Sequence, residues 1–227
     1  EFRDDRYHGL GTLEWPDGSR YQGRFVRGEP EGEGLRSNAE GQFSGTFKNG
    51  MLQGEGSYQG EDGERYSGGF RNDQFHGKGR YQSGEGEVWS GHFANGELTG
   101  KGEYRGSDGR HYQGDFRRWR FHGQGKLSLA DGSVYQGQFA NGQYAGEGTL
   151  TALDGSRTQG TWRDGELIRQ ANGTAQPDPL ELGLLQQGQL LQQALDALPA
   201  STPTVELYSL TLAGDGKQSV FLREADY

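Results

Sequence analysis

A repeat of about 23 residues runs through the first three quarters of the chain and constrains its fold more than any other feature. An aromatic residue opens each unit, a glycine follows two positions later, and a second aromatic follows four positions later. Because so strict a period indicates stacked structural units, we predict a repeat array. The aromatic pairs, which we expect to form structural rows, are Tyr21 with Phe25, Phe43 with Phe47, Tyr66 with Phe70, Trp89 with Phe93, Tyr112 with Phe116, and Tyr135 with Phe139, and a weakened last copy has Thr158 with Trp162.

Each unit reads as two short β-strands. Tyr66 and Phe70 share one face of the first strand, because side chains alternate along a strand. The second strand carries Gly77 and Gly79, followed by Tyr81. A glycine inside a strand marks a place where another group approaches closely. We therefore infer that each glycine leaves room for an aromatic ring of the neighbouring strand, and that the rings form continuous rows.

Two kinds of turn connect the strands. Asn-Gly pairs, which favour type I′ hairpin turns, join the strands within a unit, and Asp-Gly pairs lead into the next unit. Because every connection is short, we predict a continuous antiparallel meander that rises roughly 10 Å per unit. The pairs are Asn49-Gly50, Asn95-Gly96 and Asn141-Gly142 within units, and Asp17-Gly18, Asp62-Gly63, Asp108-Gly109, Asp131-Gly132 and Asp154-Gly155 between units.

These motifs resemble the MORN repeat family, and the copy at 135–157 fits nearly every position of that pattern. The resemblance covers residues 1–169. It implies a mainly β fold, an elongated antiparallel β-hairpin solenoid, that serves as a scaffold, a dimerisation surface or an accessory module beside a catalytic domain. Phospholipid binding is also attributed to the family. Residues 1–20 match the later part of a unit, so we expect the array to begin partway through a repeat.

The chain changes character after the array. Residues 170–179 are polar with two prolines and are predicted to be a linker. Residues 180–199 are predicted to form a helix, because Asp178 and Pro179 suit its start and Pro199 its end. Its apolar stripe consists of Leu180, Leu184, Leu191, Leu195 and Leu198.

Residues 204–227 are predicted to begin a truncated α/β segment. Residues 204–212 have the composition of a strand, 213–216 form a glycine turn, and a helix could open at Ser219. The stretch 207–221 is similar to the first strand and turn of the bacterial legumain-like, caspase-related cysteine peptidases. The resemblance implies a larger parent peptidase in the bacterial cell envelope, with its catalytic histidine and cysteine beyond residue 227.

Charge and composition exclude several functions. The net charge is −9, with 21 Lys+Arg and 25 Asp+Glu in residues 1–169 and 2 and 7 in residues 170–227. Neither part has the basic excess of a nucleic-acid binder, so we predict no nucleic-acid partner, and the charge disfavours a membrane-lipid partner. The chain has no cysteine. We predict no cofactor and no metal site, because His76 and His122 lie two repeats apart, roughly 20 Å.

One hairpin tip departs from the repeat rule. Arg117, Arg118, Trp119 and Arg120 stand where other units carry Asn-Gly. Arginine and tryptophan are enriched at interface hot spots, so these four residues are the candidate binding site. The alternative is sequence drift in a solvated tip. We expect Trp119 to lie at the tip, away from the aromatic rows.

The sequence thus predicts a non-catalytic scaffold or protein-interaction module, the accessory region of a larger legumain-like peptidase. We expect no catalytic residue and no activity in this chain. The partner would be another protein or the chain's own C-terminal domain. The alternatives are a peripheral phospholipid-binding module and a self-associating array that forms a homodimer.

Overall fold

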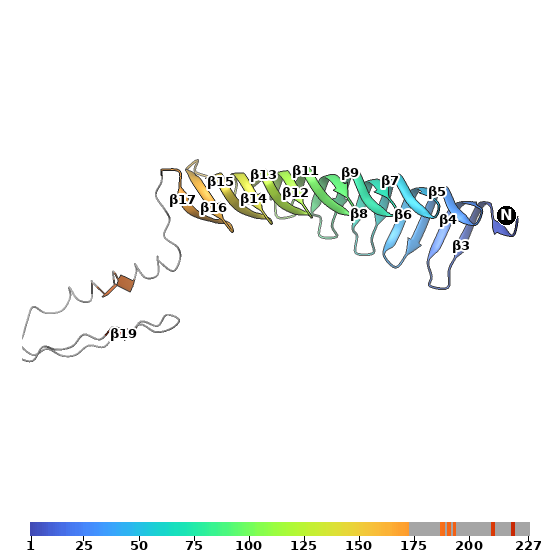
Figure 1. Ribbon diagram of the computed structural model, residues 1–227, viewed down its shortest axis with the longest axis horizontal. Helices are drawn as coiled ribbons and strands as arrows, with labels where there is room; N and C mark the ends of the chain where they lie inside the picture. Colours follow the sequence, from blue (N-terminus) through green and yellow to red (C-terminus); the bar gives the residue numbers. More distant parts are fainter. Residues whose placement is uncertain (173–186, 189, 192, 194–209, 212–218, 221–227) are drawn as a thin grey trace, which may run out of the picture. The chain divides into compact units, whose positions relative to one another are not determined.

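The computed structural model describes residues 1–172 and, beyond them, 187–188, 190–191, 193, 210–211 and 219–220. The chain divides into two units, Glu1–Gln176 and Pro177–Tyr227. The first unit holds the repeats and is an elongated array of strands (Figure 1).

The array is one sheet of 15 strands, arranged in the order of the sequence and antiparallel throughout, so the predicted mainly β hairpin meander is confirmed (Figure 1). A short hairpin of β1 (Phe2–Arg3) and β2 (Arg6–Tyr7) precedes it. The strands are β3 (Gly9–Glu14), β4 (Arg20–Val26), β5 (Glu29–Asn38), β6 (Gly41–Lys48), β7 (Met51–Gln59), β8 (Arg65–Arg71), β9 (Gln74–Gln82), β10 (Val88–Ala94), β11 (Glu97–Arg105), β12 (His111–Arg117), β13 (Arg120–Ser128), β14 (Val134–Ala140), β15 (Gln143–Thr151), β16 (Arg157–Arg163) and β17 (Glu166–Gln170).

The turns have the geometry that the sequence predicts. Asn49 and Gly50 have φ values of 51° and 78°, and positive φ at both central residues is the mark of a type I′ turn. Arg118 and Trp119 adopt the same left-handed conformation, with φ values of 50° and 66°. Neither is a glycine or an asparagine, so this tip carries a backbone strain that the Asn-Gly tips avoid.

Tyrosine rings fill the space above the glycines. In β9 a Cβ atom added to Gly79 would lie only 2.6 Å from Cε2 of Tyr66, which belongs to β8. Gly125 has the same relation to Tyr112. The inference that glycines make room for rings of the neighbouring strand therefore holds at these positions.

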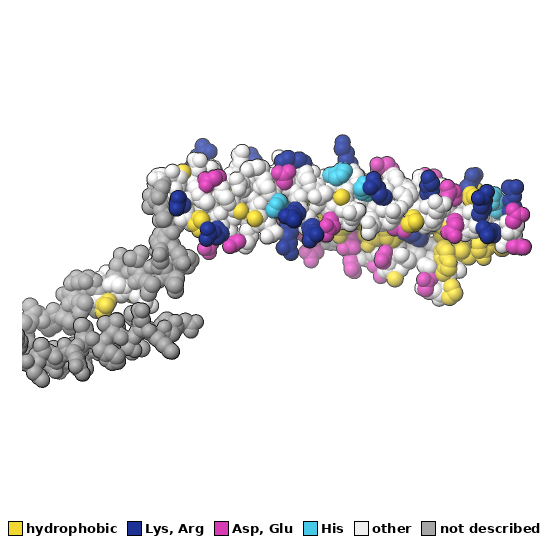
Figure 2. All heavy atoms as spheres, in the orientation of Figure 1, with side chains coloured by type: hydrophobic (Ala, Val, Ile, Leu, Met, Phe, Trp, Pro, Cys, Tyr) yellow, Lys and Arg dark blue, Asp and Glu magenta, His cyan; other side chains and the backbone are white. Residues whose placement is uncertain are grey.

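The aromatic rings form the core along one face of the sheet. The ring of Tyr66 meets Phe70 of its own unit and Phe93 of the next at centroid distances of 5.2 and 5.1 Å, both edge-on. Edge-to-face contacts of this kind are favourable beyond the area they bury. Charged side chains are scattered over the face seen in Figure 2, and acidic ones gather along its lower margin.

The same contacts continue to the last unit of the array. Phe116 and Phe139 both meet the ring of Tyr112 edge-on, at 5.1 and 5.0 Å. Trp162 meets Tyr135 at 5.4 Å, and its indole N–H donates to the carbonyl of Gly148 at 3.1 Å, so its polar atom is satisfied. Burial therefore places these side chains in the packing of the array, where a partner cannot reach them.

Of the thirteen aromatic residues that the sequence assigns to the rows, all are buried except Trp89, which is half-buried. The buried residues are Tyr21, Phe25, Phe43, Phe47, Tyr66, Phe70, Phe93, Tyr112, Phe116, Tyr135, Phe139 and Trp162.

Of the predicted helix at 180–199, the described residues Gln187, Gly188, Leu190, Leu191 and Gln193 are helical, and the remainder lies outside the described residues. Farther along, β18 (Leu210–Thr211) pairs antiparallel with β19 (Ser219–Val220). The expectation of a helix opening at Ser219 is therefore wrong, because this pairing draws residues 219–220 into an extended strand.

We expect Gly125→Ala to destabilise the array by about 2 kcal/mol, because the new Cβ overlaps the buried ring of Tyr112. Gly11 occupies the same repeat position but has only the ring of Phe25, 3.9 Å away, so Gly11→Ala should stay within about 0.5 kcal/mol of the parent. Thermal unfolding followed by circular dichroism measures both. Equal losses would show that the ring does not require the glycine.

Candidate functional site: an aromatic groove with an acidic edge

Six of the repeat units are of two kinds, which we call tyrosine units and leucine units. In a tyrosine unit the first aromatic is tyrosine, and a flat ring from the second strand stacks on it, as Phe75 does on Tyr66 at 3.8 Å and 11°. In a leucine unit a leucine of the second strand takes the space above the glycine instead, as Leu98 does above Gly91. The units that open at Tyr66, Tyr112 and Tyr135 are tyrosine units, and those that open at Phe43, Trp89 and Thr158 are leucine units.

The kind of unit decides what fits at the following hairpin tip. Each tip donates a backbone N–H to the preceding unit, for example Gly96 to the carbonyl of Phe75 at 3.0 Å. Glycine occupies the tip where the residue that accepts this hydrogen bond is aromatic, as Phe75 is. The smaller leucines leave room for a larger tip residue, so Asp73 lies over Leu52 and Trp119 over Leu98, at N–H to carbonyl distances of 3.2 and 3.1 Å.

Trp119 consequently lies on the aromatic face, and the prediction that placed it away from the aromatic rows is wrong. Its ring centroid is 5.2 Å from that of Tyr81, 5.9 Å from Trp89 and 5.3 Å from Phe93. The tip folds over the face of the sheet because it bonds to the preceding leucine unit. Arg117, Arg118 and Arg120 are exposed, with Arg118 3.7 Å from Glu97, so the structure separates them from the tryptophan.

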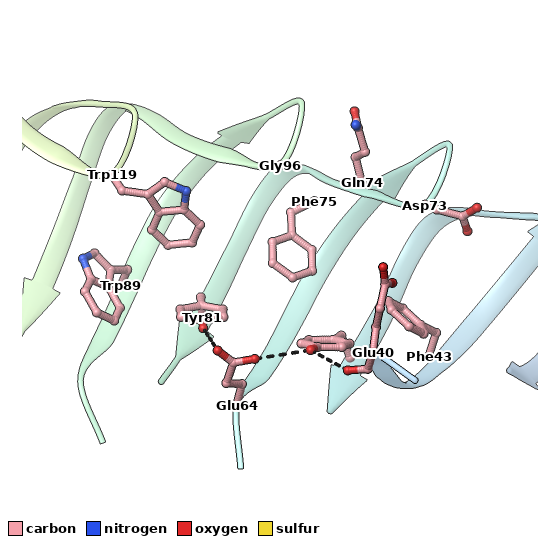
Figure 3. A pocket seen from close by; sticks show the side chains of 11 residues that line it. Glu40, Phe43, Glu64, Asp73, Gln74, Phe75, Tyr81, Trp89, Gly96 and Trp119 are labelled. Carbon is pink, nitrogen blue, oxygen red and sulfur yellow. Dashed lines mark hydrogen bonds between the residues drawn. The ribbon is translucent and has the colours of Figure 1, made fainter. Parts of the chain in front are cut away.

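The bulky tips at Asp73 and Trp119 enclose an open groove of about 630 Å³ (Figure 3). The intervening tip is Gly96, which has no side chain to cover the ring of Phe75 beneath it. Phe75, Tyr81 and Trp119 line the groove and are only half-buried. The complete lining is Glu40, Phe43, Tyr58, Glu64, Asp73, Gln74, Phe75, Tyr81, Trp89, Gly96 and Trp119.

A carboxylate held by two tyrosines borders the groove. Tyr81 donates its hydroxyl to one oxygen of Glu64 at 2.8 Å. The single hydroxyl proton of Tyr58 is shared between the backbone carbonyl of Glu40, at 2.9 Å, and the other oxygen of Glu64, at 3.3 Å (Figure 3). Burial and the neighbouring Glu64 carboxylate raise the pKa of both tyrosines, so both hydroxyls stay protonated at neutral pH. The next repeat copies the contact, since Tyr104 donates to Glu87 at 2.5 Å.

The turns beside the groove make an acidic edge, which we define as the carboxylates of the turns 38–41, 60–64 and 83–87. These turns contain no lysine or arginine. The next turn, 106–110, carries Arg110 at the position of Glu64 and Glu87. The acidic edge consists of Glu40, Glu61, Asp62, Glu64, Glu85 and Glu87.

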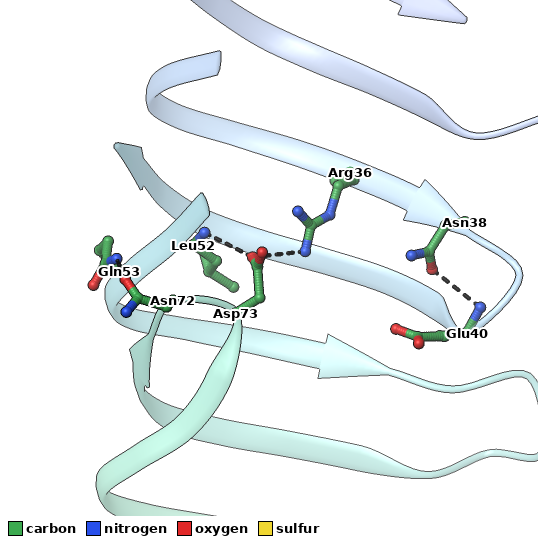
Figure 4. Close-up of polar contacts among 7 residues, drawn as sticks. All are labelled: Arg36, Asn38, Glu40, Leu52, Gln53, Asn72 and Asp73. Atoms are coloured by element: carbon green, nitrogen blue, oxygen red, sulfur yellow. Dashed lines mark hydrogen bonds and ion pairs between the residues drawn. The ribbon is translucent and has the colours of Figure 1, made fainter. Parts of the chain in front are cut away.

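One leucine unit earlier, an ion pair takes the place of the aromatic contact. Arg36 and Asp73 correspond in repeat position to Tyr81 and Trp119. Arg36 donates to Asp73 at 2.8 Å, and the same carboxylate oxygen accepts the backbone N–H of Leu52 at 2.8 Å (Figure 4). The guanidinium also lies over the ring of Phe43, 5.1 Å from its centroid. This face of the array therefore accommodates a cation between a carboxylate and an aromatic ring.

The histidines do not form a metal site in the part of the chain that the structure describes, where no group of three or more potential ligands meets. His76 and His92 have ring centroids 6.3 Å apart, and His111 contacts Glu103 at 2.6 Å. Burial and the nearby Arg71 lower the pKa of His76. No helix among the described residues has the length and apolar character needed to cross a membrane.

Seven consecutive stretches match the MORN repeat family: residues 1–20, 21–42, 43–65, 66–88, 89–109, 112–134 and 135–157. The chain belongs to the MORN repeat family. MORN repeats are in general modules for interaction with proteins or lipids. The groove and its acidic edge lie on the second to sixth of these repeats.

Among curated proteins the MORN array is similar to alsin. An alignment of 63 residues is 38% identical to alsin of Homo sapiens and of Pan troglodytes, and covers 25% of this chain and 4% of each relative. Alsin of Mus musculus matches with the same identity and coverage. The chain thus spans a small fraction of these relatives. None of these comparisons supports the peptidase resemblance of 207–221, which stays a prediction.

We expect the ion pair and the aromatic pair to be interchangeable. Arg36→Tyr and Asp73→Trp should each destabilise the array by about 1–2 kcal/mol, because each leaves a partly buried charge without its partner. The double variant installs the Tyr81–Trp119 pair and should recover about 1 kcal/mol relative to the sum. Urea unfolding of the parent, the two single variants and the double variant measures the coupling free energy between the two positions. Additive losses would contradict the equivalence of the two pairs.

We expect alkaline pH to weaken the array. Burial, with a hydrogen bond to Glu87, raises the pKa of Tyr104 to about 12, above the value near 10 of an unfolded tyrosine. The unfolded chain therefore loses the proton first, so stability is full below about pH 10 and falls as pH rises toward 12. The melting temperature at a series of pH values measures this. Tyr104→Phe should fall less steeply, and equal slopes would contradict the assignment.

Proposed function

We propose that this chain is a non-catalytic MORN scaffold and that its aromatic groove binds a short segment of a partner protein. The observation that carries the proposal is the groove itself, where half-buried aromatic rings face solvent between the tips at Asp73 and Trp119. An exposed apolar hollow with a few fixed polar groups is the usual form of a binding site. The volume of about 630 Å³ suits one or two side chains of a peptide.

A protein segment fits this groove better than a phospholipid does. Anionic headgroups are attracted by clusters of lysine and arginine, whereas the acidic edge beside the groove carries only carboxylates. A second copy of the chain stays an alternative occupant, which the solution mass tests. A legumain-like peptidase as the parent protein is a separate proposal, and the sequence of the native chain beyond residue 227 tests it.

The test is a selection of displayed peptides against the immobilised chain, followed by binding of the selected peptides to matched variants. Trp119→Gly removes one wall of the groove and restores the glycine of other tips. We expect it to weaken binding at least about tenfold, as for an interface tryptophan. Stability should fall by only about 1 kcal/mol, because relief of the strained backbone at Trp119 partly offsets the lost ring contacts.

The control is Leu153→Ala, which changes an apolar side chain that is 78% exposed in a turn of a later repeat. This variant should bind the selected peptides as the parent does. Isothermal titration calorimetry gives the affinities, and circular dichroism confirms that each variant is folded. Peptides that bind Trp119→Gly and the parent equally would show that the groove is not their site.

A further inference from the structure

We propose that the segment bound in the groove is basic, with a lysine or arginine side chain that reaches Glu64 beside an apolar side chain placed on Phe75. This inference rests on the proposed function and specifies the chemistry of the partner.

The first observation is that Glu64 is held in place but not neutralised. The hydroxyl of Tyr81 donates to one of its oxygens at 2.8 Å and that of Tyr58 lies 3.3 Å from the other, and a neutral donor leaves the charge on the carboxylate. In the part of the chain that the structure describes, no lysine, arginine or histidine pairs with Glu64, Glu40 or Glu87 within 4.0 Å. Asp73, on the opposite side of the groove, differs because Arg36 pairs with it at 2.8 Å.

The second observation is the charge of the surroundings. The acidic edge places six carboxylates in three successive turns beside the groove, without a lysine or arginine among them. Charges of one sign along a low-dielectric wall focus the field and attract a partner of opposite charge. The aromatic walls of this groove are such a surface, so a cationic segment gains both attraction and apolar contact here.

The third observation is that the array already holds a cation in this manner. Arg36 lies over the rings of Phe43 and Phe47, at 5.1 and 5.4 Å, and pairs with a carboxylate. One leucine unit later the equivalent position is Tyr81, so the array supplies no cation of its own there. Trp89 and Trp119 line the groove, and tryptophan is the side chain whose ring cations bind most favourably.

The chain's own C-terminal part does not have this chemistry. Residues 170–227 hold 2 Lys+Arg and 7 Asp+Glu, and residues 180–199 contain Glu181 and Asp196 but no lysine or arginine. Such a segment would bring like charge to the acidic edge. The charge balance therefore points to a separate basic partner rather than to the helix that the sequence predicts at 180–199.

The test compares three synthetic peptides of equal length, in which leucine alternates with lysine, glutamine or glutamate. We expect the leucine–lysine peptide to bind at least about tenfold more tightly than the leucine–glutamine peptide at low ionic strength, and the leucine–glutamate peptide to bind weakest. The advantage of lysine should shrink at high salt, because salt screens exposed charges. Calorimetric titration at two salt concentrations measures all three affinities.

Glu64→Gln isolates the carboxylate, because glutamine keeps an oxygen for the tyrosine hydroxyls while the charge is lost. We expect it to weaken the leucine–lysine peptide about tenfold and to leave the leucine–glutamine peptide unchanged, which a general loss of structure would not do. The control is Glu166→Gln, an exposed carboxylate of β17 away from the groove. Gln74→Arg adds a positive charge at the exposed lip of the groove and should also weaken the leucine–lysine peptide.

Two outcomes separate this inference from the proposed function. If the leucine–glutamine peptide binds the groove as tightly as the leucine–lysine peptide, the groove is a peptide site without basic preference, and only the inference is overturned. If no selected or synthetic peptide loses affinity in Trp119→Gly, both fall. A dimer in analytical ultracentrifugation that the leucine–lysine peptide does not displace, and that blocks its binding, would make a second copy the occupant and overturn the inference.

Discussion

The contact on which this structure depends is a tyrosine ring laid over a pair of glycines on adjacent strands. Tyr66 covers Gly68 of its own strand and Gly79 of the next, and its hydroxyl donates to the carbonyl of Gly69 at 2.9 Å. A side chain at either glycine would displace the ring. The contact recurs in the other tyrosine units, so it places the row of rings along the array.

The leucine units turn this regular array into a surface with a particular shape. A leucine fills the space over the glycine in these units, and its side chain is smaller than the ring that occupies this place in a tyrosine unit. The smaller side chain also admits a large residue at the next tip. Two leucine units, with one tyrosine unit between them, leave a groove between the tips at Asp73 and Trp119. The tip between these two is the glycine Gly96. The groove is thus a consequence of packing within a single-layer sheet.

The electrostatics of the groove follow from the same repetition. Turn residues recur every 23 positions along one edge, so a preference for glutamate in three successive turns becomes a continuous acidic edge. Tyrosine hydroxyls hold two of these carboxylates, Glu64 and Glu87, in fixed positions. The charge of Glu64 remains available to a partner, because hydroxyl donors satisfy its oxygens without neutralising them, whereas Arg110 interacts with the charge of Glu87.

The sequence by itself determined the strands, the turns and the aromatic rows, because these features depend on local spacing and on the small size of glycine. The rows include Phe116, Phe139 and Trp162 in the later repeats, and all three are buried. It indicated the type I′ tips and the meander without any knowledge of long-range contacts. It failed at Trp119, where only the tertiary structure showed that the tip bonds back to Leu98 and folds over the aromatic face. The residues that distinguish tyrosine units from leucine units are present in the sequence. Their meaning appeared only when the residues packed, because a groove is made by the volumes of side chains that come from different repeats.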